Sequence, residues 1–99
     1  MNDSFYQALV DQICDAVNED WNYVKVEVEI DVEGDDYEIA TTGMYKIGEN
    51  DMSGFVANKA IVDMLEDLYE QMAGQGKFWK KATFEIYDNG QFSLEFDYL

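Results

Sequence analysis

The side chains best suited to chemistry or binding in this sequence are acids gathered in one stretch, VKVEVEIDVEGDDYE, at positions 24–38. Seven carboxylates crowd there against a single lysine. They are Glu27, Glu29, Asp31, Glu33, Asp35, Asp36 and Glu38. Carboxylates at this density can hold a cation, dock a basic protein or simply keep a surface hydrated, and these uses require different surroundings.

Use as a calcium site requires a strict spacing of ligands. A loop of the EF-hand type has acids at positions one, three and five, glycine at six and glutamate at twelve. Counted from Asp31, positions one, three and five are acidic, but position six is Asp36 and position twelve is Thr42. The pattern fails where it is most specific, and a hairpin turn explains the same residues. We therefore expect no metal and no cofactor.

Charge and composition narrow the class of protein. The 99 residues include 22 acids and 6 basic residues, all of them lysine, for a formal net charge of −16. Such a charge repels nucleic acids and anionic membranes and attracts basic partners. Most acid–base and nucleophilic mechanisms lack their usual residues, since no histidine is present to activate the one cysteine, Cys14. The composition predicts a binding protein that is not an enzyme.

The sequence carries no recognisable export or membrane signal. The first 17 residues lack the basic start and the apolar run of a signal peptide. No stretch of about 18 apolar residues is present to span a membrane. The single cysteine cannot form a disulfide within the chain and fits a reducing compartment. We expect a cytoplasmic protein.

Apolar residues recur at helical spacing in two segments, 3–17 and 54–72. The first segment has Phe5, Leu9, Ile13 and Val17 on one face, and the second has Ile61, Met64, Leu65, Leu68 and Met72. Asp3 or Ser4 is suited to cap the first helix. Gly74 is the expected left-handed residue after the second helix.

Strand patterns fill most of the remaining sequence. Residues 22–33 alternate apolar and polar side chains, and so do residues 37–47 after a turn at positions 33–36. Residues 48–54 have the composition of a loop. Residues 78–99 form a second predicted hairpin, in which Asn89 and Gly90 favour a two-residue type I′ turn. Ala82, Phe84 and Ile86 are expected to face Phe92, Leu94, Phe96 and Tyr98 across this turn.

These elements predict one fold class. Two amphipathic helices and two amphipathic hairpins in the order α-β-β-α-β-β give an α+β, two-layer sandwich. The antiparallel sheet has four strands, with both helices on one face and water on the other. No linker or repeat interrupts the chain, so residues 1–99 are predicted to be a single domain.

The solvent face of this sheet is predicted to be broadly acidic. Glu27, Glu29, Asp31 and Glu33 share it by their alternation, and Glu85, Glu95 and Asp97 join them. Neighbouring acids of one strand lie about 6.6 Å apart on the same face and repel by about 0.6 kcal/mol in water. The fold alone does not require such crowding, so we expect a basic partner on this face.

Three large side chains fall on the same face by parity, namely Met44, Trp79 and Tyr87, and such residues often anchor interfaces. Two alternatives stay open: the acids only hydrate the surface, or the partner binds the outer face of the second helix. That rival face carries Asp63, Glu66, Asp67 and Glu70.

The C-terminal third contains four motifs in order: Phe78-Trp79, Ala82-Thr83-Phe84, the turn Asp88-Asn89-Gly90 and the segment 92–98. In these residues it resembles the YezG-like immunity proteins, which end in a tryptophan-led strand, a D-G-type turn and a strand closing on an acidic aromatic F/Y-D-Y motif. The N-terminal order of a helix followed by Glu19-Asp20-Trp21 is also similar. The resemblance implies a small acidic antitoxin that blocks the toxin domain of a polymorphic bacterial toxin, often a nuclease.

The sequence therefore predicts an immunity protein that binds and neutralises a cognate toxin domain, a basic nuclease in particular, through an acidic surface. The alternative is an acidic adaptor or nucleic-acid mimic that binds a DNA-binding protein. The expected partner-binding residues are Glu27, Glu29, Asp31, Asp35, Asp36, Trp79, Glu95 and Asp97. No catalytic residue, nucleic-acid contact or membrane contact is predicted.

Overall fold

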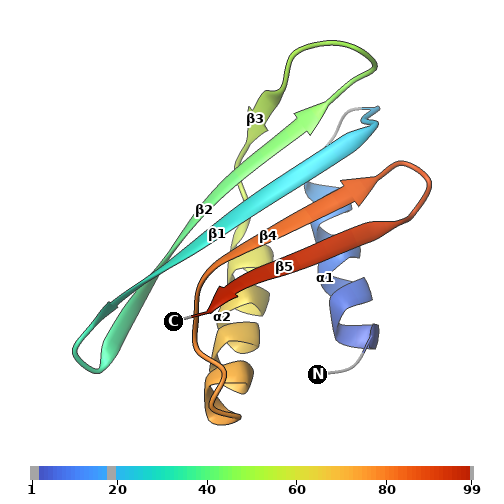
Figure 1. Ribbon diagram of the computed structural model, residues 1–99. Coiled ribbons are helices and arrows are strands. Elements are labelled where there is room, and N and C mark those ends of the chain that lie inside the picture. The colour runs from blue at the N-terminus through green and yellow to red at the C-terminus, as the bar shows by residue number, and fades with distance from the viewer. Residues whose placement is uncertain (1–2, 18–19, 99) are drawn as a thin grey trace.

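The computed structural model describes residues 3–17 and 20–98, which form two helices and five strands (Figure 1). In chain order they are α1 (Asp3–Ala16), β1 (Tyr23–Glu33), β2 (Asp36–Lys46), β3 (Ser53–Phe55), α2 (Lys59–Gly74), β4 (Trp79–Tyr87) and β5 (Phe92–Tyr98). The predicted α+β class is confirmed, with the order α-β-β-β-α-β-β. No helix in the described ranges is long and apolar enough to cross a membrane.

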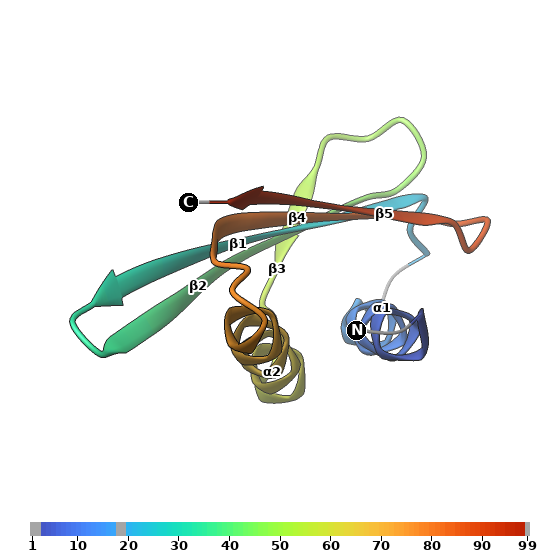
Figure 2. The same ribbon diagram turned by 60° about the horizontal axis from the view of Figure 1, so that its bottom comes forward.

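One antiparallel sheet runs in the order β3-β2-β1-β4-β5, with β1 at its centre. Figure 2 shows α1 and α2 on the same face of the sheet, as the amphipathic pattern predicts, and the other face uncovered. β4 pairs with β1 only along residues 23–29. The far ends of β1 and β2, residues 30–39, therefore project as a two-stranded ribbon, which we call the arm (Figure 1, lower left).

The core lies between the sheet and the helices. Val24, Val26 and Val28 of β1 are fully buried, and so are Leu9 of α1 and Leu65 of α2. Each such side chain contributes about 1.5–3 kcal/mol when it leaves water. The described residues include no buried polar or charged side chain, which is why the alternation in β1 predicts its two faces so clearly.

A fifth strand, β3, lies where a loop and the start of a helix were predicted, so the expectation of four strands is wrong. β3 pairs with the end of β2, with Phe55 opposite Gly43. A Cβ atom on Gly43 would come within 2.8 Å of the Phe55 ring, so the missing side chain makes room for the strand. The second helix begins at Lys59 instead of residue 54, and the Asn58 side chain caps it by accepting a 3.0 Å hydrogen bond from the amide of Ile61.

The turn between β4 and β5 also differs from its prediction. Ile86 pairs with Phe92, and the amide of Tyr87 donates to the carbonyl of Gln91 at 2.9 Å, so the loop has three residues, 88–90. The predicted two-residue turn would place Ile86 opposite Ser93 and break the match of the apolar faces. Gly90, with φ +86°, supplies the only left-handed residue of this turn.

The end of α2 corrects a further prediction. Gly76, with φ +79°, is the left-handed residue after the helix, whereas Gly74 is the last helical residue. The amide of Lys77 donates to the carbonyl of Met72 at 2.8 Å, and the amide of Gly76 to that of Ala73 at 3.0 Å. These two bonds form a Schellman motif, which stops the helix and redirects the chain toward β4.

Candidate partner-binding surface

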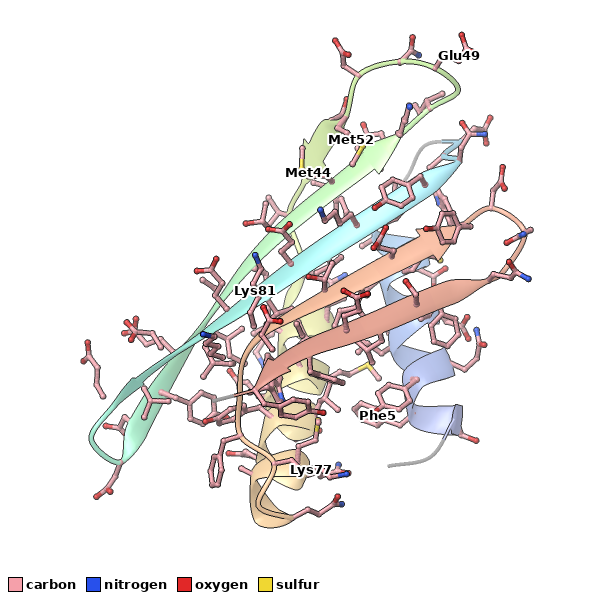
Figure 3. All side chains as sticks on the ribbon, viewed as in Figure 1. Phe5, Met44, Glu49, Met52, Lys77 and Lys81 are labelled. Atoms are coloured by element: carbon pink, nitrogen blue, oxygen red, sulfur yellow. The ribbon has the colours of Figure 1, made fainter. Side chains whose placement is uncertain are left out.

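The face of the sheet opposite the helices, which we call the open face, carries alternate residues of β1, β2, β4 and β5 (Figure 3). Its charged and large residues are Tyr23, Lys25, Glu27, Glu29, Asp31 and Glu33 of β1, Asp36, Glu38, Met44 and Lys46 of β2, Lys81, Glu85 and Tyr87 of β4, and Glu95 and Asp97 of β5. The predicted acids do share this face. Three lysines lie among them, however, so the open face is not acidic throughout.

Two of these lysines, Lys25 and Lys81, lie beside Glu27 at the centre of the open face. Lys25 Nζ lies 3.1 Å from Glu27 Oε1, and Lys81 Nζ lies 3.9 Å from Glu27 Oε2. The hydrogen bond from Lys25, followed by the charge of Lys81, lowers the pKa of the Glu27 carboxyl. Glu27 is thus ion-paired within the protein, so a basic partner would have to compete with Lys25 and Lys81 for it.

The end of the open face beyond Glu27 is aromatic and polar. The Tyr23 hydroxyl donates a 2.7 Å hydrogen bond to Glu85 Oε2, and the ring of Tyr23 lies 5.5 Å from that of Tyr87. Burial, followed by the bond to Glu85, raises the pKa of the Tyr23 hydroxyl. Alternation predicted both Tyr87 and Glu85 on this face, but not the hydrogen bond between Tyr23 and Glu85.

A hollow of about 500 Å³ adjoins this aromatic end. It is lined by Asn22, Tyr23, Lys46, Gly48, Glu49, Asn50, Asp51 and Met52, and Figure 3 labels Glu49 and Met52 in the loop beside it. The Asn22 side chain holds the loops together, because it donates to Asp88 Oδ2 at 3.2 Å and accepts from the amide of Gly48. Sequence reasoning missed this hollow, since its residues come from separate loops.

The opposite end of the open face, on the arm, is uniformly acidic. Asp31 lies directly opposite Glu38, and Glu33 lies directly opposite Asp36. Asp35 sits in the turn between the strands. All five of these side chains are exposed, and none of them joins an ion pair within residues 3–17 and 20–98. We call these five carboxylates the acidic arm.

Three further predicted acids lie on the open face outside the arm. Glu29 is exposed on β1, between Ala40 of β2 and Lys81 of β4. Asp97 lies opposite Lys81 from the other side, and Glu95 lies opposite Thr83. The sheet therefore joins Glu29, Asp31, Asp35 and Asp36 at one end of the molecule and places Glu95 and Asp97 on its outermost strand.

Trp79 is not on the open face, which overturns the prediction from parity. It pairs with Tyr98, whereas Lys81 pairs with Asp97, so one extra residue bulges from β4 between them. A bulge reverses the alternation that precedes it. The Trp79 side chain turns into the core and is only 1% exposed, and its indole N–H has no hydrogen-bond partner among the described residues.

Trp79 belongs instead to a row of five aromatic rings on the helix side of the sheet. The neighbouring ring centroids lie 4.7 Å apart for Tyr37–Tyr69, 5.4 Å for Tyr69–Trp79, 5.4 Å for Trp79–Phe96 and 6.0 Å for Phe96–Tyr98. This aromatic row links the arm to β5 through α2 and β4. Trp79 thus packs within this row and does not serve as the surface anchor that was expected from the sequence.

The acids of α2 form a less concentrated surface than the arm. Asp63 Oδ2 accepts a hydrogen bond from Lys59 Nζ at 2.9 Å, one turn earlier. Burial, followed by the effects of Glu70 and then Glu66, raises the pKa of Tyr37 to about 12. Part of this face is therefore engaged within the protein. Across the described ranges, no three potential ligand side chains are grouped to hold a metal ion.

The sequence matches no protein-family model and no curated protein. The resemblance to the YezG-like immunity proteins thus stays a prediction from the quoted residues. Of those residues, Glu19 lies outside the described ranges, Asp20 is exposed and Trp21 is half-buried.

Proposed function

We propose that this protein is an immunity protein, which binds a cognate bacterial toxin domain in the cytoplasm and neutralises it. The toxin surface that fits best is basic, such as the phosphate-binding cleft of a nuclease. The acidic arm carries this proposal: it concentrates on one projecting ribbon five carboxylates that have no ion-pair partner among the described residues. Like charges directly opposite each other destabilise a sheet. A basic partner bound to the arm would therefore reduce the repulsion between these carboxylates.

The net charge supports rapid binding to such a partner. A charge of −16 on a 99-residue protein steers it toward a basic surface and raises the association rate by about 10–10³-fold. An immunity protein has to act before its toxin does, so fast association suits the proposed role. Glu29, beside the arm, and Glu95 and Asp97 on β5 extend the same negative field.

Co-expression tests the proposal directly. The product of the gene beside this one is expressed in a bacterial host, and growth is followed with and without this protein. Wild-type protein should restore growth and co-purify with the product at low salt in a one-to-one complex. A triple variant of the arm, Asp31→Asn with Asp36→Asn and Glu38→Gln, should protect less and associate more slowly.

A matched control keeps the same net charge as the arm variant. Asp15→Asn, Glu66→Gln and Asp67→Asn change three exposed acids of the helix layer, and this control should protect as the wild type does. Equal losses in both variants would show that only net charge matters. A neighbouring product that is harmless, or that this protein does not bind, overturns the proposal. Co-purification of assorted DNA-binding proteins would favour the nucleic-acid mimic.

A further inference from the structure

The sheet has two edges of very different length. β3 closes one edge with three residues, whereas β5 leaves the other edge open along Phe92–Tyr98. An edge strand offers a row of unpaired N–H and C=O groups to any strand that lies beside it. The outer side of β5 is thus unpaired along the whole strand, whereas β2 is unpaired only beyond β3, along residues 36–42 of the arm and its base.

The register identifies the free groups of β5. The amide of Tyr87 donates to the carbonyl of Gln91, and hydrogen-bonded pairs alternate along an antiparallel ladder. Ser93 and Glu95 therefore bond toward β4, opposite Glu85 and Thr83. The N–H and C=O groups of Phe92, Leu94 and Phe96 point away from the sheet.

Apart from the charges of Glu95 and Asp97, β5 lacks the features that usually protect an edge from pairing. The chain contains no proline, and β5 contains no lysine. The one irregularity of the β4–β5 ladder lies at Trp79 and Lys81, so Phe92–Phe96 is regular. On the helix side, Phe92, Leu94 and Phe96 are only half-buried and Tyr98 is 51% exposed, which leaves apolar surface for a further strand to cover.

Charge selects what can pair with this edge. The open-face side of β5 presents Glu95 and Asp97, and neither joins an ion pair within the described part of the chain. A lysine or arginine on an added strand would lie about 4.5–5.5 Å from them, Cβ to Cβ. The β5 edge therefore offers free backbone groups, a row of apolar side chains and two carboxylates along one strand.

A second copy of this protein is a poor occupant for the same reason. Pairing two β5 strands about a two-fold axis at Glu95 sets the two Glu95 side chains opposite each other. An axis at Phe96 sets Glu95 opposite Asp97, and an axis at Leu94 leaves the two Glu95 side chains diagonal. Every register with substantial overlap brings acid near acid, which opposes the pairing.

We propose that β5 receives an extended basic segment of another protein as a sixth strand of the sheet. Its main chain pairs with Phe92, Leu94 and Phe96, and its lysine or arginine side chains meet Glu95 and Asp97. The assignment of this segment to the toxin rests on the proposed function. The strand addition itself depends only on the geometry and charge of β5.

Amide hydrogen exchange followed by NMR tests the pairing on the full chain. The probe is a nine-residue peptide of alternating lysine and valine. It should slow exchange at the amides of Phe92, Leu94 and Phe96 by about tenfold when bound, since these amides become hydrogen-bonded. The same peptide with alternate backbone nitrogens methylated cannot pair, and a glutamate–valine peptide has the wrong charge; neither should slow these amides.

A charge swap makes the test specific. The variant Glu95→Lys with Asp97→Lys should prefer the glutamate–valine peptide, whereas Glu66→Lys with Asp67→Lys, of equal net charge, should keep the wild-type preference. Binding that leaves the three β5 amides unprotected, or that the methylated peptide reproduces, overturns the inference. The inference also falls if sedimentation shows that the free protein is a dimer and hydrogen exchange shows the three β5 amides protected in that dimer.

The two proposals can fail separately. If the lysine–valine peptide pairs with β5 but no neighbouring toxin is neutralised, the strand addition stands and the proposed function falls. If a toxin is neutralised equally by wild type and by the Glu95→Lys, Asp97→Lys variant, with no β5 amide protected, the strand addition falls alone.

Discussion

Asp31 and Glu38 face each other across the β1–β2 ribbon, on the same side of the sheet, with no lysine paired to either among the described residues. The next pair toward the turn, Glu33 and Asp36, repeats the arrangement. Cross-strand neighbours of like charge repel most strongly when they are directly opposite. Repulsion between these carboxylates therefore destabilises the arm in the free protein.

Reversing one charge of this pair should stabilise the free protein. Glu38→Lys turns the repulsion with Asp31 into attraction, and we expect a gain of about 0.5–1 kcal/mol in 10 mM sodium chloride. The gain should shrink in 0.5 M salt, where the screening length falls below about 5 Å. Urea denaturation at both salt concentrations measures it. Asp67→Lys, on the exposed face of α2, gives the effect of net charge alone; an equal gain there would contradict the local account.

Trp79 should matter for stability instead of for surface binding. It is 1% exposed and lies between Tyr69 and Phe96, so Trp79→Ala should cost about 3–5 kcal/mol. Phe78, its neighbour in sequence, is 47% exposed. Phe78→Ala should cost less than about 1 kcal/mol. Denaturant melts of the two variants provide the comparison, and similar costs would mean that the bulge before Lys81 does not turn Trp79 inward.

Substitution of Gly43, where β3 joins the sheet, should lower the stability of the protein. An added methyl would lie 2.8 Å from both the ring and the carbonyl of Phe55, so Gly43→Ala should cost about 1–3 kcal/mol through overpacking. A methyl added at Gly54, on β3 itself, would have only one atom nearby, the Gly43 carbonyl oxygen at 3.8 Å. Gly54→Ala should therefore be nearly neutral. Thermal melts of both variants decide whether β3 is held by this contact.

Tyr23 should make the protein sensitive to alkaline pH. Its folded-state pKa is raised by burial and by the bond to Glu85, whereas an unfolded tyrosine ionises near about pH 10. The stabilisation is thus complete below about pH 10 and is lost as pH rises through the folded pKa. We expect Tyr23→Phe to cost about 1 kcal/mol at pH 7, with a smaller difference from wild type at pH 11.

A nearby hydroxyl controls for general alkaline effects. The Tyr87 hydroxyl lies 3.5 Å from the same Glu85 oxygen, a weak contact by its length. Tyr87→Phe should therefore leave the pH dependence close to that of the wild type. A gap between wild type and Tyr23→Phe that stays constant from pH 7 to pH 11 would contradict the role given to the Tyr23–Glu85 bond.

Strongly periodic elements were predictable because burial alone decides them. Residues 22–33 were expected as a strand, and β1 spans Tyr23–Glu33 with its valines buried as far as Val28. The corrections come from positions where tertiary contacts decide. β3 is too short to have a period and depends on space at Gly43. The bulge before Lys81 and the three-residue turn at 88–90 depend on how β4 and β5 match their apolar rows.

The candidate site likewise has a part that could be predicted from the sequence and a part that depends on tertiary contacts. Alternation along one strand was enough to place Glu29 and Asp31 on the open face. The ion pairing of Glu27 with Lys81 could not be predicted, because Lys81 reaches it only through the register between β1 and β4, strands that are distant in sequence. Like-charge pairing on the arm was equally hidden, since it depends on the two-residue turn that sets Asp31 against Glu38.

The aromatic row gives the protein an optical property. Indole absorbs at longer wavelengths than phenol, so excitation of Tyr37 or Tyr69 passes to Trp79, which is shielded from water. On its other side Trp79 contacts Phe96, and Phe96 contacts Tyr98 at the sheet edge. A strand added along β5 would cover Tyr98 and Phe96 without contacting the buried indole of Trp79. With the second tryptophan, Trp21, replaced by phenylalanine, the intrinsic fluorescence of Trp79 would therefore report docking at the edge in real time.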